Sequence, residues 1–105
     1  MDKAQYLLMK LAEECAEVAQ RAIKQMQFGK LEIQPGQPLT NGERLMQEVN
    51  DMGVILELLI EEKEMPDYNE REQEWDKLKE TKIAKMNKYL QLSESLGRMT
   101  KGFRI

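Results

Sequence analysis

Helical periodicity runs through most of this chain and is interrupted at two proline-containing segments, which constrains the fold more than any other feature. From about Lys3 to Phe28, apolar residues recur at alternating steps of three and four, the spacing of one helix face. This predicted face consists of Leu8, Leu11, Cys15, Val18, Ala22 and Met26. Gly29 is a suitable residue to end the helix. Residues 30–39 contain two prolines and are predicted to form a loop.

A second helix is predicted after this loop. Thr40 and Glu43 stand at the spacing of a capping box, so the helix should begin there and run to about Glu64, before Pro66. The apolar face of this helix is formed by Leu45, Met52, Ile55, Leu56 and Leu59.

A third helix is predicted up to about Ser95, followed by Gly97 and a basic tail over residues 97–105. It should begin after a cap at Asp67 or Asn69, with Glu70 or Glu72 three residues further on. Its inward stripe is predicted to contain Trp75, Leu78, Lys82, Met86, Tyr89, Leu92 and Leu96.

The length of 105 residues is enough for one domain, and helix-forming residues dominate over 3 Pro and 6 Gly. We therefore expect an all-α fold, an antiparallel bundle of three main helices with room for a short fourth, in a single domain spanning residues 1–105. Because one small helical domain buries a modest core, we expect a second or further copy to complete it, giving a homodimer or homotetramer.

Charge and composition exclude several classes of function. The net charge of −3, from 16 basic and 19 acidic residues, offers no basic field for a nucleic-acid polymer. The chain has no histidine, which excludes histidine-based catalysis and leaves carboxylates as metal ligands and general bases. A single cysteine, a charged N-terminal start and apolar runs too short to span a bilayer predict a cytoplasmic protein without membrane contact.

Two pairs of acidic residues stand at helical spacing. Glu14 and Glu17 lie three positions apart in the first helix, and Glu48 and Asp51 do so in the second, so each pair emerges on one side of its helix. Packed against each other, the two helices could bring four carboxylates to one point, a ligand set that suits Mg²⁺.

Acidic residues on helices are often simply solvated, and for the first helix that interpretation is reasonable. It is harder to sustain for Glu48, which falls inside the apolar arc of the second helix and therefore needs a partner. A lysine, an arginine or a metal could be that partner, and four carboxylates together favour the metal. Lys82, at the centre of the third helix's stripe, could either pair with these acids or reach the phosphates of a ligand.

Together these motifs resemble the MazG-like, all-alpha nucleoside triphosphate pyrophosphohydrolase superfamily, whose signature is EExxE on one helix and ExxD on the next. Here the motif stands as Glu13-Glu14-x-x-Glu17 and Glu48-x-x-Asp51, and the similarity covers roughly residues 5 to 90. The loop between the two halves is longer than in many members, which leaves substrate choice open.

The resemblance implies a set of residue roles. Magnesium, with manganese as a substitute, would be held by Glu14, Glu17, Glu48 and Asp51. Glu13 would assist the metal shell or position the attacking water. Because the chain has no histidine, the base would be a carboxylate, with Glu13 or Glu17 best placed, or a metal-bound hydroxide. Phosphate-binding residues come from the following helix, where Lys82 is the first choice and Lys85 and Asn87 are further candidates.

The implied activity is hydrolysis of an ordinary or deoxy nucleoside triphosphate to the monophosphate and pyrophosphate, through attack of a metal-activated water on the α-phosphorus. Two alternatives stay open. One is a non-catalytic helical oligomer, acting as an adaptor or regulatory protein whose acids bind a partner's basic residues. The other, within the same superfamily, is a phosphoribosyl-ATP pyrophosphohydrolase.

Overall fold

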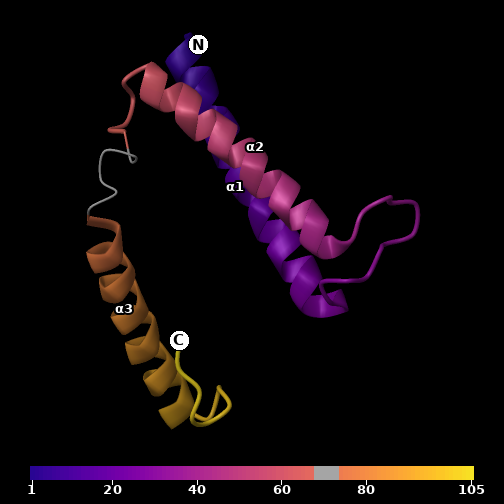
Figure 1. Cartoon of the computed structure of the whole chain (residues 1–105), viewed down its shortest axis with the longest axis vertical. Helices are drawn as coiled ribbons and strands as arrows, with labels where there is room; N and C mark the ends of the chain where they lie inside the picture. The colour runs from indigo at the N-terminus through magenta and orange to yellow at the C-terminus, as the bar shows by residue number, and fades with distance from the viewer. Residues whose placement is uncertain (68–73) are drawn as a thin grey trace. The chain divides into compact units, whose positions relative to one another are not determined.

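A computed structural model describes residues 1–67 and 74–105 of the chain. Over these residues the protein has three helices and no strand: α1 (Lys3–Phe28), α2 (Asn41–Glu61) and α3 (Trp75–Ser95) (Figure 1). The prediction of an all-helical protein is confirmed. Contacts divide the chain into two compact units, Met1–Pro66 and Asp67–Ile105, and each is described on its own. The prediction of a single domain stays a prediction.

Capping residues explain both ends of α1. Asp2 accepts a hydrogen bond from the backbone N–H of Gln5 at 2.9 Å, and the Gln5 side chain accepts one from the N–H of Asp2. At the other end Gly29 adopts a φ of 91°, a conformation that favours glycine, and donates its N–H to the Gln25 carbonyl oxygen at 2.8 Å. The predicted bounds of this helix are confirmed.

The capping box predicted for α2 is also present. The Thr40 hydroxyl accepts from the N–H of Glu43, and the Glu43 carboxylate accepts from the N–H of Thr40, each at 3.1 Å. The helix ends at Glu61, however, three residues before the predicted Glu64. Lys63 has a φ of 60°, and this left-handed residue turns the backbone out of the helix.

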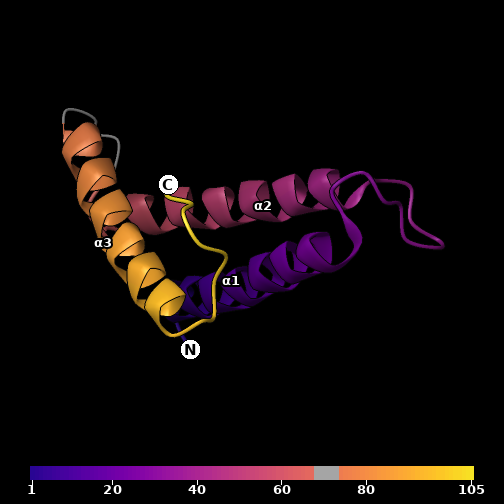
Figure 2. The same ribbon diagram turned by 90° about the horizontal axis from the view of Figure 1, so that it is seen from below.

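Helices α1 and α2 lie side by side as a hairpin (Figure 2). At one end, Lys3 Nζ contacts Glu62 Oε1 at 2.7 Å, which joins the start of α1 to the end of α2. At the other end the connecting loop is tied to α2, because Gly42 N–H donates to the Lys30 carbonyl oxygen at 3.0 Å. A methyl group at Gly42 would lie 3.3 Å from that oxygen, so the close approach favours glycine. These ties fix the register of the hairpin.

The hairpin buries a narrow stripe. Leu7 and Leu59, exposed by 5% and 1%, are the fully buried apolar residues of the part that the structure describes. The predicted apolar face of α2 lies on its shielded side, since Leu59 is buried and its other members are half-buried. The predicted face of α1 is only partly covered: Leu11 and Val18 are half-buried, but Leu8, Cys15, Ala22 and Met26 are exposed. The predicted apolar face of α1 therefore coincides only in part with the side that α2 covers.

The reason lies in the breadth of the apolar arc of α1. The one neighbouring helix, α2, covers only one stripe of this arc. Several residues of the covered stripe lie one position before the predicted ones, for example Leu7 in place of Leu8. That stripe carries polar residues as well, because Glu14, Arg21 and Gln25 are half-buried while Met26 is 80% exposed.

The second unit consists of α3 and the residues around it. Among the residues proposed to cap this helix, Asn69, Glu70 and Glu72 lie outside the described residues. The helix begins at Trp75 with Glu74 at its N-cap position, so the predicted cap at Asp67 is wrong, whereas the predicted end at Ser95 is confirmed. Much of the predicted apolar stripe is exposed within this unit: Trp75 by 63%, Leu78 by 48%, Tyr89 by 55%, Leu92 by 52% and Leu96 by 67%. In the portion of the chain that is described, no helix combines the length and apolarity required to cross a membrane.

Candidate metal centre

Three acidic side chains from two helices meet in the middle of the hairpin. Carboxylate oxygens of Glu14 and Glu17 on α1 and of Glu48 on α2 lie within 4.8 Å of one another. The neighbouring contact between Cys15 Sγ and Met52 Sδ, at 3.9 Å, marks the place where the helices pass each other. The structure thus brings together three of the four residues predicted to hold a metal.

Two oxygens of this cluster are buried and have no hydrogen-bond partner among the described residues, namely Oε2 of Glu14 and Oε2 of Glu48. Glu14 and Glu48 are half-buried, whereas Glu17 is exposed at the open side of the cluster. It is energetically unfavourable for a carboxylate oxygen to be shielded from water without gaining a hydrogen-bond donor. The cluster therefore needs a cation or a proton.

The electrostatics of the cluster reflect this need. Burial raises the pKa of Glu48 above its ordinary value, and a hydrogen bond with Glu17 together with the charges of Glu17, Glu14 and Asp51 raises it further. Burial likewise raises the pKa of Glu14, followed by the charges of Glu17 and Asp51. Lys10 acts in the opposite direction on Glu14, as a smaller effect.

Asp51 and Glu13 lie at the margins. Asp51 is exposed and is not one of the three acids that converge, but its charge acts on both Glu14 and Glu48. Glu13 is exposed and forms an ion pair with Lys10 Nζ at 2.8 Å. The roles predicted for these two residues stay predictions, with Asp51 the better placed of the two.

The predicted phosphate-binding residues belong to the other unit. Lys82 and Lys85 are exposed within it, and Asn87 is half-buried. Asn87 uses both polar atoms of its amide within its own unit, on the backbone of Ile105. Their approach to the acidic cluster stays a prediction.

Sequence reasoning missed three polar residues along the hairpin. Arg21 Nη1, Gln25 Oε1 and Asn41 Oδ1 are buried without a hydrogen-bond partner among the described residues. Arg21 lies one helical turn after Glu17, and Gln25 lies one turn after Arg21. The helical spacing that pointed to Glu14 and Glu17 could therefore also have pointed to these two residues. Asn41 gave no such signal, because its burial (1% exposed) depends on how the loop folds against α2.

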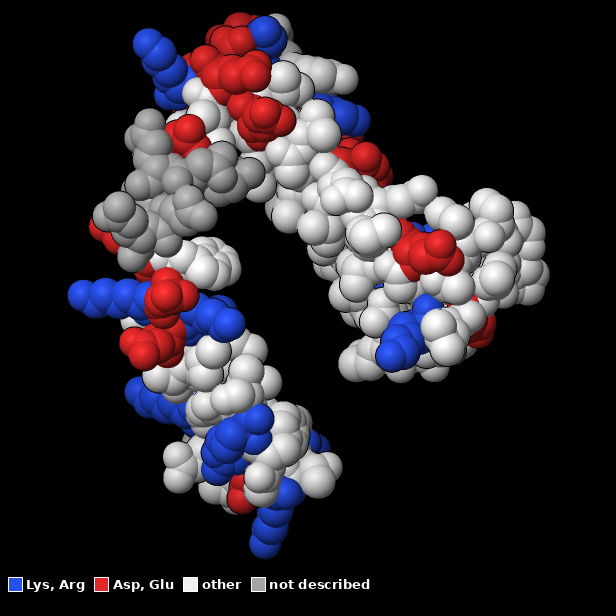
Figure 3. Space-filling view, in the orientation of Figure 1, with Lys and Arg blue, Asp and Glu red and all other residues white. Residues whose placement is uncertain are grey.

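Charge is divided unequally between the two units. Residues 1–66 contain 7 basic and 12 acidic residues, a net charge of −5, and residues 67–105 contain 9 basic and 7 acidic residues, a net charge of +2. In Figure 3 acidic side chains gather where α2 ends, and lysine and arginine side chains project along α3. The residues predicted to hold a metal and those predicted to bind phosphates therefore belong to different units.

No protein-family model, curated protein or solved structure matches the chain. The chemistry of the cluster itself therefore carries the functional inference. An all-oxygen donor set, with three carboxylates in reach of one point, fits a hard divalent cation such as Mg²⁺ and is poorly suited to a soft metal.

Proposed function

We propose that the protein is a magnesium-dependent nucleoside triphosphate pyrophosphohydrolase, which hydrolyses an ordinary or deoxy triphosphate to the monophosphate and pyrophosphate. The observation that carries the proposal is the meeting of Glu14, Glu17 and Glu48 within 4.8 Å, with a buried oxygen on two of them left unpaired. The proposal is supported by the motif context, EExxE followed by ExxD, which resembles that of the MazG-like superfamily.

In this proposal Glu14 and Glu48 hold the metal from the sheltered side of the hairpin, and Glu17 and Asp51 complete the site from the exposed side. Bound Mg²⁺, or Mn²⁺ in its place, would offset the charge of the phosphates and lower the pKa of a water molecule. Because the chain has no histidine, a carboxylate receives the proton of the attacking water, and Glu17 or Glu13 takes this role.

Lysines of α3 neutralise the phosphates. The net charge of +2 in residues 67–105 supports this division of labour, since the acidic unit alone would repel a polyphosphate. Lys82 is the first candidate, followed by Lys85 and Asn87. In this arrangement α3 packs with the hairpin into an antiparallel bundle.

We further propose that the bundle is completed by other copies of the chain, as a homodimer or homotetramer. With Leu7 and Leu59 as the fully buried apolar residues of the described part, the chain alone has little core. Exposed apolar residues on α3, such as Trp75 and Tyr89, supply surface for this association.

The test is product formation across a panel of ordinary and deoxy triphosphates with magnesium, with phosphoribosyl-ATP included to address the alternative substrate. We expect release of pyrophosphate from at least one triphosphate by the native chain and its loss in Glu48→Gln. Glu57→Gln is the matched control, because Glu57 is an exposed residue of the same helix. Equal turnover by Glu48→Gln and the native chain would exclude this site as the catalytic centre.

The exposed apolar stripe of α3 also favours the second candidate, a non-catalytic adaptor. Thermal unfolding separates the two functions. An enzyme of this kind should be stabilised by magnesium, and further by magnesium with a nonhydrolysable triphosphate. An adaptor should show neither effect.

A further inference from the structure

The residues after α3 fold back along the helix from which they came. The chain turns at Gly97, whose φ is 72°, and Arg98 N–H donates to the Ser93 carbonyl oxygen at 2.8 Å. From there residues 98–105 run back beside α3 (Figure 1). All of these residues belong to one unit, so their arrangement does not depend on the hairpin.

Two side chains of α3 hold the returning segment. The Glu94 carboxylate accepts from Arg104 Nη1 at 3.1 Å and from the N–H of Gly102 at 3.3 Å. Asn87 donates from Nδ2 to the Ile105 carbonyl oxygen at 3.2 Å and accepts at Oδ1 from the N–H of Ile105 at 2.8 Å. The Asn87 amide therefore pairs with both backbone groups of a single residue.

The two anchors hold points that lie close together along the chain. Asn87 and Glu94 are seven residues apart on one helix, which corresponds to about 10.5 Å along its axis. Gly102 and Ile105 are separated by three steps of chain, which reach at most about 10–11 Å when fully extended. Because only three steps of chain separate the two contacts, loss of one anchor should loosen the other.

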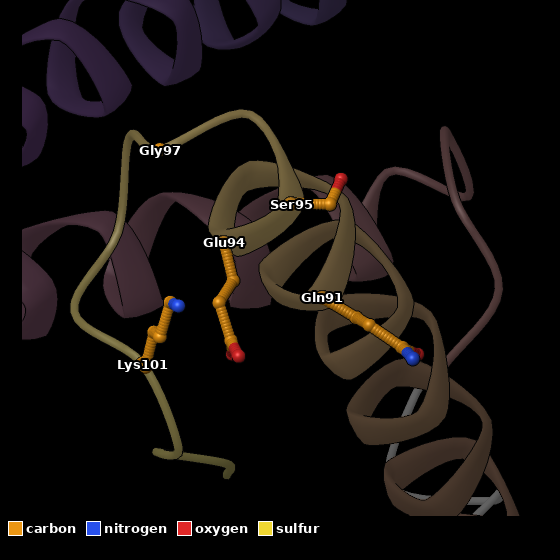
Figure 4. A pocket seen from close by; sticks show the side chains of 5 residues that line it. All are labelled: Gln91, Glu94, Ser95, Gly97 and Lys101. Carbon is orange, nitrogen blue, oxygen red and sulfur yellow. The ribbon is translucent and has the colours of Figure 1, made fainter.

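One ion pair and several hydrogen bonds attach the segment to α3. A hollow of about 500 Å³, lined by Gln91, Glu94, Ser95, Gly97 and Lys101, lies between the returning segment and the end of α3 (Figure 4). Phe103 and Ile105 stay 41% and 58% exposed, so neither side chain is fully buried by the attachment. A segment held by an exposed ion pair and a few hydrogen bonds can detach at modest cost.

We propose that residues 98–105 form an autoinhibitory strap, which occupies Asn87 when docked on α3 and must detach before that amide can bind the phosphate of a ligand. The inhibitory role rests on the proposed function, in which Asn87 is a phosphate-binding residue. Docked and detached states compete, so the strap lowers the apparent affinity for a polyphosphate in proportion to the docked fraction.

Docking itself is tested by hydrogen exchange at the amides of Gly102 and Ile105 in the full chain. Arg104→Ala removes the ion pair to Glu94, and we expect both amides to exchange faster, by about 1.4- to 5-fold for a surface ion pair. Lys101→Ala is the matched control, because it removes a tail cation that has no ion-pair partner among the described residues. Faster exchange at Gly102 with no change at Ile105 would show that the anchors are independent and would overturn the strap.

The inhibitory role is tested by adding magnesium with a nonhydrolysable triphosphate. We expect the Ile105 amide to exchange faster as the ligand binds, at lower ligand concentration in Arg104→Ala than in the native chain. Binding heat without a change at Ile105, or weaker binding by Arg104→Ala, would refute the inhibition and leave the proposed function intact. Absence of binding and of hydrolysis in every form would refute the proposed function and the inhibitory role with it.

Discussion

Replacing Glu48 by glutamine should stabilise the metal-free protein and destabilise the magnesium-bound one. Glu48 is half-buried, its Oε2 atom has no hydrogen-bond partner among the described residues, and it faces two further acids within 4.8 Å. Two unit charges at 4.8 Å repel each other by about 1 kcal/mol when screened as in water. Without metal, Glu48→Gln should therefore raise the free energy of unfolding by about 1 kcal/mol, or the midpoint of thermal unfolding by about 4–8 °C.

Magnesium should reverse this order. A cation present at about 100 times its dissociation constant stabilises the native chain by about 2.7 kcal/mol, and the variant lacks one of the ligands that provide this gain. Urea unfolding followed by circular dichroism, with and without magnesium, measures both effects, and Glu57→Gln should change neither. Lower stability of Glu48→Gln in the absence of metal, or an equal magnesium effect in the variant and the native chain, would refute the reasoning.

Three further predictions concern pH and packing. Burial and neighbouring acids raise the pKa of Glu14 and Glu48 in the folded protein. Without metal, the free energy of unfolding should therefore increase as pH falls from 7 towards the ordinary carboxylate range. Urea titrations should show a smaller increase for Glu48→Gln than for the native chain. Leu59→Ala removes a side chain that is 1% exposed and should cost about 2–5 kcal/mol in urea unfolding, whereas Val54→Ala, at a position 54% exposed, should cost far less. Asn41→Ala removes hydrogen bonds to Gly29 and Glu32 and should cost about 1–3 kcal/mol by thermal unfolding, and an unchanged midpoint would contradict the structural role of that amide.

Local signals in the sequence predicted the helices well. Gly29 and the Thr40–Glu43 capping box act within one turn of chain, and both appear as predicted. The predicted end of α2 lies three residues too late. The prediction rests on Pro66, but the backbone already turns out of the helix at Lys63. The ends of α1 and α3 agree with the prediction, so short-range signals predict a boundary well where a cap or a glycine marks it and less well where only a more distant proline does.

Features that depend on packing were predicted less well. The position of Glu48 inside an apolar arc correctly indicated that it would be shielded, because that arc of α2 lies on the side that packs against α1. The arc of α1 is broad, and the sequence could not tell which part of it the hairpin would cover. As a result Cys15 belongs to the predicted apolar face but is exposed, while Arg21 lies outside that face but is half-buried.

The ties at the base of the interhelical loop separate its tip from the rest of the hairpin. The N–H groups of Asn41 and Gly42 bond to the carbonyl oxygens of Glu32 and Lys30, and these bonds close the loop at its neck. Residues 33–39 lie beyond the neck, so extra residues there need not shift one helix along the other. The tip is therefore a site where evolution or engineering could graft a new segment while the spacing of the carboxylates is preserved.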